Sequence, residues 1–407
     1  MAEAFLVGGA RTPVGRYGGA LSSVRPDDLA ALTIRKVIDD AGIDPALVDE
    51  VIYGNANGAG EENRNVARMA WLLAGFPDTV PGITVNRLCA SGMSAITMAS
   101  HMIKAGAADI VVAGGVESMS RAPWVMEKPS KAFAKPGATF DTSIGWRFTN
   151  PQFLSGEYSR GGKATFSMPE TAEEVARVYN ISREAADQFA VESHAKAIAA
   201  IEAGHFVDEI VPVTVKGRKG DTIVDTDEGP RPGTTLEVLS KLRPVVAGGS
   251  VVTAGNASSL NDGASAIIVA SEHAIEKYGL KARARIVDGQ AAALAPEIMG
   301  MGPVPSTQKV LSRAGLDISA IGAMEINEAF ATQSLASMNE LGVDPAIVNR
   351  DGGAIALGHP LGSSGSRIVI TLLNRMEREL SGEGRKLGVA TMCVGVGQGT
   401  ALLVEGV

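Results

Sequence analysis

Cysteine, aromatic residues and long apolar runs are scarce in this chain of 407 residues. Its two cysteines, Cys89 and Cys393, are too few for a disulfide framework or a set of zinc ligands, and they favour a reducing, cytoplasmic setting. No apolar run approaches the roughly 18 residues of a membrane-spanning helix. Residues 1–10 lack the basic start of a signal peptide, so we expect neither a membrane segment nor a leader.

Positive charge is also in short supply. The formal net charge is −8, whereas binding to a phosphate backbone needs clustered Lys and Arg side chains. We therefore expect no nucleic acid and no anionic membrane surface as the main partner. A local basic spot for one phosphorylated ligand stays compatible with this charge.

Glycine, by contrast, is abundant. Its 48 residues make up about 12% of the chain, against ~7% in average proteins, and they follow no three-residue period of the collagen kind. Hydrophobic residues account for 45% and charged residues for 20%, which excludes a disordered chain. The composition predicts a protein of two or three domains with many tight turns and close backbone approaches.

Short apolar runs alternate with helical patterns at both ends of the chain, which predicts an α/β fold with parallel strand pairing in the first 120 residues. The expected strands are residues 5–7, 51–53, 83–88, 109–113, 264–270, 285–289, 324–327 and 388–393. The expected helices are residues 27–40, 63–74, 91–104, 329–341 and 363–378. The shared alternation suggests a duplicated α/β unit, although the similarity of the letters is too weak to prove a repeat.

The middle of the chain differs from its ends. Residues 121–250 are richer in charge, are interrupted by proline and glycine, and contain amphipathic helical patterns at residues 170–179 and 182–203. We interpret them as an inserted segment with its own small helical unit. A series of solvated surface loops is the alternative.

Cys89 lies between a predicted strand and a predicted helix, in the segment NRLCASG at residues 86–92. The free N–H groups and the positive dipole end of a helix favour a thiolate, and the small neighbours leave room for a substrate. Cys89 is therefore a candidate nucleophile. The alternative is a buried structural cysteine.

His359 lies in the glycine-rich segment GGAIALGHPLG at residues 352–362, where Pro360 restricts it to extended dihedral angles. Of the other four histidines, we expect His194, His205 and His273 at the surface and His101 in helix packing. His359 is therefore the candidate general base.

Two further candidates lie at strand ends. Cys393 enters a glycine turn in TMCVGVGQG at residues 391–399, whose N–H groups could converge on an oxyanion; a cysteine beside a β-hairpin is the alternative. Asn327, in EINEAF at residues 325–330, is either a helix N-cap or a ligand for a water or carbonyl group. Ligands of open α/β sheets bind at such strand ends. Two cysteines and a histidine without a metal motif fit thiol-based acyl chemistry.

Six segments, in this order along the chain, resemble the thiolase family. They are residues 86–92, GGVESMS at 114–120, AGNAS at 254–258, and residues 327–330, 352–362 and 393–399. The resemblance extends over essentially the whole chain and implies a five-layered αβαβα fold with duplicated mixed-sheet halves. It implies an N-terminal half at residues 1–120 and 251–275, an inserted loop domain at 121–250 and a C-terminal half at 276–407. A homodimer or homotetramer is usual in the family.

Within the family, the segments IGWRF at 144–148 and SMPETA at 167–172 are similar to 3-oxoadipyl-CoA thiolases of the degradative branch, which serves fatty acid or aromatic degradation. Val396 replaces a common glycine, and Ser167 replaces the histidine of biosynthetic acetoacetyl-CoA enzymes. Acetoacetyl-CoA and medium-chain 3-ketoacyl-CoA remain alternative substrates. Arg147 is a candidate for binding a distal carboxylate, with a surface ion pair as the alternative.

Two other functions are disfavoured. An NAD-dependent oxidoreductase would need G-x-G-x-x-G after the first strand, which is absent. A thiolase-fold protein without catalysis is at odds with the presence of Cys89, His359 and Cys393.

The resemblance implies roles for individual residues. Cys89 becomes the acylated nucleophile, His359 the base that activates it, and Cys393 the group that exchanges a proton with acetyl-CoA. One oxyanion site would use Asn327, through a water, with His359, and the other the N–H groups of Cys89 and Gly395. CoA is implied as co-substrate, with no permanently bound cofactor and no metal. The implied CoA contacts are Ser258, Arg231, Met168, Met299 and Phe330, with plain core packing as the alternative for Met299 and Phe330.

Overall fold

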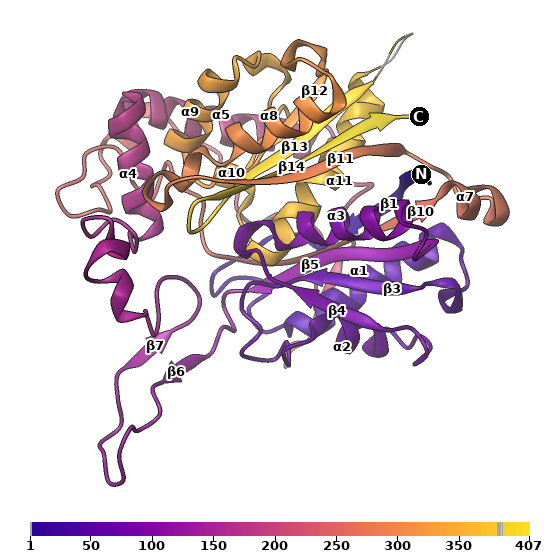
Figure 1. Ribbon diagram of the computed structural model, residues 1–407, viewed down its shortest axis with the longest axis horizontal. Helices are drawn as coiled ribbons and strands as arrows, with labels where there is room; N and C mark the ends of the chain where they lie inside the picture. Colours follow the sequence, from indigo (N-terminus) through magenta and orange to yellow (C-terminus); the bar gives the residue numbers. More distant parts are fainter. Residues whose placement is uncertain (1, 381–383, 385) are drawn as a thin grey trace.

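A computed structural model describes residues 2–380, 384 and 386–407. In this part of the chain, ten strands form one mixed sheet with the order β12-β13-β14-β11-β1-β10-β5-β3-β4, and β2 pairs with β10 (Figure 1). The strands are β1 (Ala4–Arg11), β2 (Gly15–Arg16), β3 (Glu50–Gly54), β4 (Gly82–Val85), β5 (Ile110–Ser118), β10 (Asn261–Ser271), β11 (Ala284–Ala293), β12 (Ala323–Ile326), β13 (Leu387–Val394) and β14 (Gln398–Gly406).

The sheet consists of two halves with the same strand arrangement. The N-terminal half has the order β1-β10-β5-β3 and the C-terminal half the order β11-β14-β13-β12. The two first strands, β1 and β11, pair with each other through Phe5 with Arg285 and Leu6 with Ala284. The expected duplicated α/β unit is therefore confirmed at the level of topology, and the duplicated halves share one sheet.

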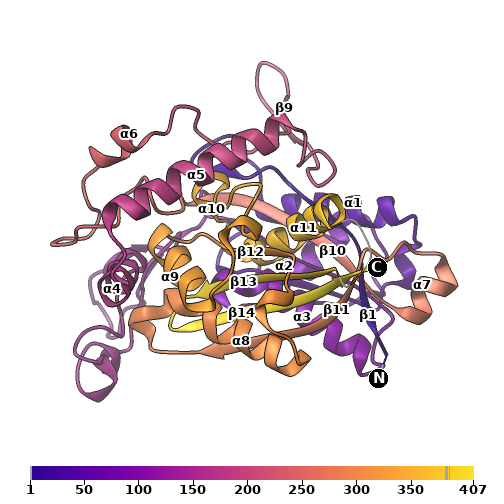
Figure 2. The ribbon, with the colours of Figure 1, turned by 90° about the horizontal axis from the view of Figure 1, so that it is seen from above.

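Helices on both sides of each half complete five layers (Figures 1 and 2). Helices α3 (Ser91–Lys104) and α11 (Leu361–Glu379) pack against each other between the two halves, where both faces are apolar. Helices α1 (Pro26–Ala41) and α2 (Val66–Leu73) cover the outer face of the N-terminal half, and α8 (Pro303–Ala314) and α9 (Ala331–Leu341) the outer C-terminal side. The implied αβαβα fold is confirmed.

Parallel pairing holds for only part of the first 120 residues. Strands β3, β4 and β5 are parallel to one another, as expected. Strand β1, however, is antiparallel to both β10 and β11. The expectation was wrong for β1 because its partners come from beyond residue 250, a pairing that local alternation does not report.

Two expected elements end differently in the structure. The strand expected at 83–88 ends at Val85, because Leu88 has φ +48° in the left-handed region and begins a 3₁₀ turn at Leu88–Ala90. The helix expected at 63–74 begins only at Val66, where the side chain of Asn65 caps it by accepting the N–H of Arg68.

Two histidines lie where they were not expected. His194 is 6% exposed on α5 (Arg183–Glu202), and its Nδ1 accepts the N–H of Arg231. It is buried because α5 packs over the molecule rather than lying in solvent. His101, expected in packing, is exposed on α3. His205 is part-buried and bonds to Asp351 at 2.8 Å.

The middle segment contains a protruding arm and a helical unit (Figure 1). The arm carries strands β6 (Trp124–Met126) and β7 (Thr139–Asp141), and the helical unit carries α4 (Met168–Tyr179) and α5. Further elements are β8 (Val213–Val215), β9 (Thr222–Val224), α6 (Leu236–Ser240), α7 (Glu272–Tyr278) and α10 (Ala354–Leu357). Both expected helices are present, whereas the division into domains at residues 120, 250 and 275 stays a prediction.

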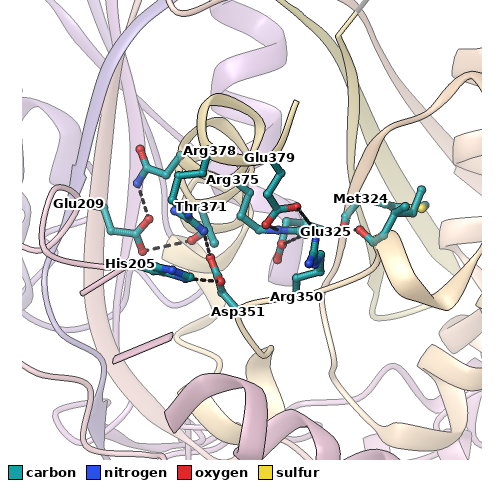
Figure 3. A network of polar contacts seen from close by, with 12 residues as sticks. His205, Glu209, Met324, Glu325, Arg350, Asp351, Thr371, Arg375, Arg378 and Glu379 are labelled. Atoms are coloured by element: carbon teal, nitrogen blue, oxygen red, sulfur yellow. Dashed lines mark hydrogen bonds and ion pairs between the residues drawn. The ribbon is translucent and has the colours of Figure 1, made fainter. Parts of the chain in front are cut away.

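A network of ion pairs, some of them buried, holds the C-terminal part of α11 (Figure 3). Arg375 donates to Glu325 of β12 at 2.5 Å, and Arg378 pairs with Asp351, which His205 also contacts. For the buried pair of Arg375 and Glu325, removing one partner typically costs about 3–5 kcal/mol. The network therefore fixes the position of α11 relative to β12. Within the described ranges, no helix has both the length and the apolar character needed to cross a bilayer.

Candidate active site

Cys89 lies in the 3₁₀ turn that joins β4 to α3. Side chains around it hold the unfavourable left-handed backbone of Leu88. Asn86 Oδ1 accepts the N–H of Leu88 at 2.8 Å, and Ser91 Oγ accepts the N–H of Arg87 at 2.9 Å while donating to the carbonyl of Leu88. The turn thus holds the thiol at the start of a helix, as expected from the sequence.

Burial is the main influence on the pKa of the Cys89 thiol. It raises the pKa of Cys89 to about 11, and the negative charge of Glu117 acts in the same direction. The N–H groups of Gly395 and of Cys89 itself point to the sulfur and lower the pKa, but they do not outweigh desolvation. The expected lowering of the thiol pKa by the helix start was therefore wrong. Cys89 is a neutral thiol near pH 7, so its activation needs a base.

His359 precedes α11 and is buried. Its N–H donates to Asn261 Oδ1 at 2.8 Å, and its Nδ1 lies 2.6 Å from Ser364 Oγ. Because the hydroxyl of Ser364 donates to the carbonyl of Pro360, the network assigns the ring proton to Nδ1. Nε2 is then an acceptor, and it has no partner among the described residues.

Gly358 makes the backbone next to His359 possible. It has φ +107°, and a Cβ there would lie 2.6 Å from the side-chain amide of Asn261. Burial, with the charge of Arg367 as a second cause, lowers the pKa of His359 to about 3. The imidazole is therefore neutral near pH 7 and can accept a proton through Nε2.

Cys393 and Asn327 lie on neighbouring strands of the other half. Asn327 follows β12, and its N–H donates to the carbonyl of Thr391 on β13, two residues before Cys393. Burial raises the pKa of Cys393, and Cys89 is a second cause of the rise, so the two thiols are near enough to interact. Cys393 is 1% exposed and stays protonated near pH 7.

The side chain of Asn327 is buried, and neither Oδ1 nor Nδ2 has a partner among the described residues. The N-cap alternative was wrong, because Phe330 is the N-cap of α9. Buried polar atoms without partners are rare in proteins and call for a reason. The amide of Asn327 can bind an oxygen atom of a substrate or a water, and His359 Nε2 can accept a hydrogen bond from a water or a thiol.

The first turns of α3 and α11 meet directly, which brings the elements of Cys89 and His359 together. A Cβ on Gly92 would lie 2.7 Å from the carbonyl oxygen of Gly362 and 2.6 Å from Ser366 Oγ. A Cβ on Gly115 would overlap the same carbonyl oxygen. Glycine at these two positions allows the approach.

A cavity of about 220 Å³ opens at Cys89. The two sheet halves contribute Leu88, Cys89, Leu361, Gly395, Val396, Ala56 and Asn57, and the inserted segment contributes Thr142, Ser143, Ile144, Gly145, Trp146, Arg147, Ser167 and Met168. Val396 lies here in the left-handed region at φ +63°, where a β-branched residue is strained. Arg147 is the one charged side chain among these lining residues.

Only one of the residues that the resemblance implies for CoA binding lines the cavity at Cys89. Met168 lines the cavity, whereas Met299 and Phe330 are buried in one apolar cluster with Cys393. Ser258 is half-buried, and its N–H donates to the carbonyl of Ala329. Arg231 is exposed, binds His194 through its N–H, and is not among the residues that line the cavity.

Glu117 is a residue of the site that the sequence reasoning missed. It is 2% exposed on β5, and its carboxylate accepts N–H groups from both halves of the molecule. A charged residue inside the apolar run of residues 110–118 was the available signal, but the segment served only as a family motif. Within residues 2–380, 384 and 386–407, no group of three or more His, Cys, Asp or Glu side chains could hold a metal ion.

Comparison with known proteins completes the description of the site. The thiolase N-terminal domain matches residues 4–273, and the thiolase C-terminal domain matches residues 280–406. The chain is 53% identical to a β-ketoadipyl-CoA thiolase of Pseudomonas aeruginosa, over 99% of each chain. It is 51% identical to a 3-oxoadipyl-CoA/3-oxo-5,6-dehydrosuberyl-CoA thiolase of Escherichia coli, over 100% of each. The solved acetyl-CoA acetyltransferase of Bacillus anthracis is 39% identical with a TM-score of 0.91, covering 100% of this chain and 99% of its own.

Proposed function

The chain belongs to the thiolase family of acyltransferases, and from this premise we propose that it cleaves 3-oxoadipyl-CoA with CoA, yielding acetyl-CoA and succinyl-CoA. The relatives at 51–53% identity carry this substrate in their names. CoA is a co-substrate in this proposal, and no permanently bound cofactor takes part. The reaction is reversible as a Claisen condensation.

The first half-reaction forms an acyl-enzyme. His359 Nε2 takes the proton of the Cys89 thiol, and the sulfur attacks the 3-keto carbon of the substrate. The bond between C2 and C3 breaks, the acyl group stays on Cys89, and acetyl-CoA leaves as its enolate. The neutral imidazole and the neutral thiol described above support this assignment, because a base with a free Nε2 must remove the proton.

Cys393 protonates the enolate at carbon. The thiol of a second CoA then gives its proton to the Cys393 thiolate as its sulfur attacks the acyl group, and Cys89 leaves and takes back the proton held by His359. The raised pKa of Cys393 supports its role as a proton donor. Two sites stabilise negative oxygen: the N–H groups of Cys89 and Gly395, and Asn327 with His359. Losing one such donor typically costs about 10²–10³ in rate.

The observation that carries the choice of substrate is Arg147. It is half-buried in the cavity that Cys89 opens into, and among the described residues its hydrogen bond is to the amide oxygen of Asn57 at 3.4 Å. No ion pair joins it to a carboxylate within the described residues. A guanidinium without a counterion beside an acyl-binding cysteine is suited to the distal carboxylate of a short dicarboxylic acyl chain.

A thiolysis panel tests the substrate. We expect kcat/KM for 3-oxoadipyl-CoA to exceed that for 3-ketohexanoyl-CoA, which has the same chain length but no carboxylate, by about 10²-fold, as removal of a charged hydrogen-bonded group implies. In Arg147→Met the preference should fall to within about fivefold, mainly through a higher KM for 3-oxoadipyl-CoA.

Arg160→Met is the matched control, because Arg160 is an exposed arginine of the same segment that pairs with Glu297. It should leave the preference unchanged. A wild-type protein that favours acetoacetyl-CoA or 3-ketohexanoyl-CoA would overturn the substrate proposal. An unchanged preference in Arg147→Met would remove Arg147 from it.

We propose that the protein is a homodimer that pairs further into a homotetramer. Strand β4 is an edge of the sheet, and apolar side chains are exposed on it and on the helices beside it. They are Ile83, Met69, Leu72, Leu73 and Met98, each between 37% and 46% exposed. The arm presents a second apolar surface with Trp124, Met126 and Phe133.

We also propose a cytoplasmic location, which the two free cysteines support.

Light scattering after size exclusion measures the assembly. We expect a mass of about four chains of 42.0 kDa each for the wild type. Ile83→Lys should release monomers, because a lysine on an edge strand opposes strand pairing, whereas Trp124→Lys should stop at dimers. Val207→Lys, at a 73% exposed position of the inserted segment, is the control that keeps the wild-type mass. A monomeric wild type would contradict the proposal.

A further inference from the structure

The carboxylate of Glu117 joins the two halves of the site. Its Oε2 accepts the N–H of Ala56 at 3.0 Å and the N–H of Gly362 at 2.8 Å, and its Oε1 accepts the N–H of Asn57 at 3.1 Å. The side chain of Asn55 also donates to Oε1, at 3.4 Å. Gly362 is in the first turn of α11, three residues after His359, and Ala56 and Asn57 line the cavity.

Packing alone would not require a carboxylate at this buried position of β5. Burying a carboxylate is costly unless its oxygen atoms accept hydrogen bonds, and here donors come from β3's following loop and from α11. A Cβ on Gly362 would lie 2.3 Å from the carbonyl oxygen of Val116 and 2.8 Å from that of Gly54, so the helix start packs closely against β3 and β5. Because Gly362 lies three residues after His359, the hydrogen bond from Gly362 to Glu117 holds the turn that directly follows the imidazole.

Glu117 also acts on Cys89 through its charge. Burial is the largest cause of the raised pKa of Cys89, and the negative charge of Glu117 adds to it. Burial raises the pKa of Glu117 itself to about 7, with Glu62 adding to the rise and the N–H donors opposing it. Since the pKa of Cys89 is about 11, Glu117 is ionised over the range in which Cys89 titrates.

We propose that Glu117 is a positioning residue: its carboxylate fixes the start of the His359-bearing helix against the loop after β3, and its negative charge adds to the burial that disfavours a thiolate at Cys89. The proposal rests on the roles of Cys89 and His359 proposed above. It explains why an ionisable residue lies in the interior run of β5, where every residue is buried.

Charged and titratable groups from several elements bear on the titration of Cys89. Glu117 on β5 and Cys393 on β13 interact with Cys89 through charge, Arg147 lines the same cavity, and His359 lies in the loop before α11. Glu62 acts on Glu117, and Arg367 of α11 acts on His359. His359 and Cys393 change charge outside the range between pH 7 and 11, so they add no step to the titration of Cys89 in that range.

The test is the pH dependence of alkylation of Cys89 by iodoacetamide, followed by mass spectrometry of the Cys89 peptide in the full-length protein. In Glu117→Gln we expect the midpoint of reactivity to move to lower pH by about one unit, because a like charge has been removed. We expect kcat for thiolysis to fall about 10–100-fold. The side-chain amide that replaces the carboxylate has one NH₂ group, which must face backbone N–H groups that need an acceptor.

Two controls separate charge from shape. Glu117→Asp keeps the charge but withdraws the carboxylate from Gly362, so its midpoint should stay at the wild-type value while kcat falls at least about tenfold. Glu62→Gln removes a neighbouring buried carboxylate that acts on Glu117, and should leave the midpoint in place. If Glu117→Gln does not fold, the kcat of Glu117→Asp still tests the positioning role.

A midpoint in Glu117→Gln that is unchanged or higher would overturn the charge role, and so would an equal shift in Glu62→Gln. A near-wild-type kcat in Glu117→Asp would overturn the positioning role. Alkylation needs only the thiol, so its outcome is independent of whether the protein performs thiolysis. A failure of the proposed function would instead be seen as absent turnover in the wild type.

Discussion

The Cys89→Ala variant is expected to form no acyl-enzyme and to lose thiolysis by about 10⁴-fold or more, the scale seen when a nucleophile of a catalytic unit is removed. Cys89 lines the cavity, whereas Cys393 is 1% exposed and is not among the lining residues, so we expect no second sulfur to take over the attack. The measurement is intact-protein mass spectrometry after mixing with acetyl-CoA or the 3-ketoacyl-CoA, together with a thiolysis assay.

Cys393→Ala is the matched control for this experiment, because it removes a thiol of the same site without removing the proposed nucleophile. The acyl mass should appear in Cys393→Ala and in the wild type, and in neither case on a peptide other than that of Cys89. An acyl adduct that persists in Cys89→Ala would refute the assignment of the nucleophile. Unfolding of Cys89→Ala is checked by its melting temperature.

The second large effect is expected in Cys393→Ala itself. It should still be acylated by acetyl-CoA, but its rate of carbon–carbon cleavage and condensation should fall by about 10³-fold or more, since general acid–base transfer contributes about 10²–10⁴. The protein keeps the Cys393 thiol protonated by burial, which suits a group that delivers a proton to an enolate. Without it, the enolate has no proton donor at carbon.

Deuterium exchange isolates this step from acylation. Wild-type protein in heavy water should wash deuterium into the methyl group of acetyl-CoA, and Cys393→Ala should not. Cys89→Ala provides the reverse combination, with Cys393 intact and acylation absent. Near-wild-type thiolysis in Cys393→Ala would remove this thiol from the mechanism.

Local signals in the sequence were reliable where one element determines the outcome. Helix α3 spans the residues expected, 91–104, and Cys89 lies at its start because a strand end and a short turn precede it. The glycine turn after Cys393 was likewise apparent from the run of residues 394–399. In these cases neighbouring residues alone fix the backbone.

Properties that depend on distant segments were not predictable. The antiparallel pairing of β1 requires β10 and β11, and the burial of His194 requires the packing of α5 over the molecule. The raised pKa of Cys89 has the same origin, because burial by distant segments and the charge of Glu117 are tertiary effects. Local electrostatics of a helix start gave the wrong direction for this reason.

The pairing of β1 with β11 has a consequence for how ligands enter and leave. Since the two halves share backbone hydrogen bonds and a common apolar layer around α3 and α11, they cannot rotate apart as hinged lobes do. Exchange of one thioester for another is therefore expected to leave the two halves in place and to use the cavity lined by residues 142–147 and 167–168. A long, narrow ligand that carries its reactive sulfur at one end fits a cavity between two halves that do not move apart.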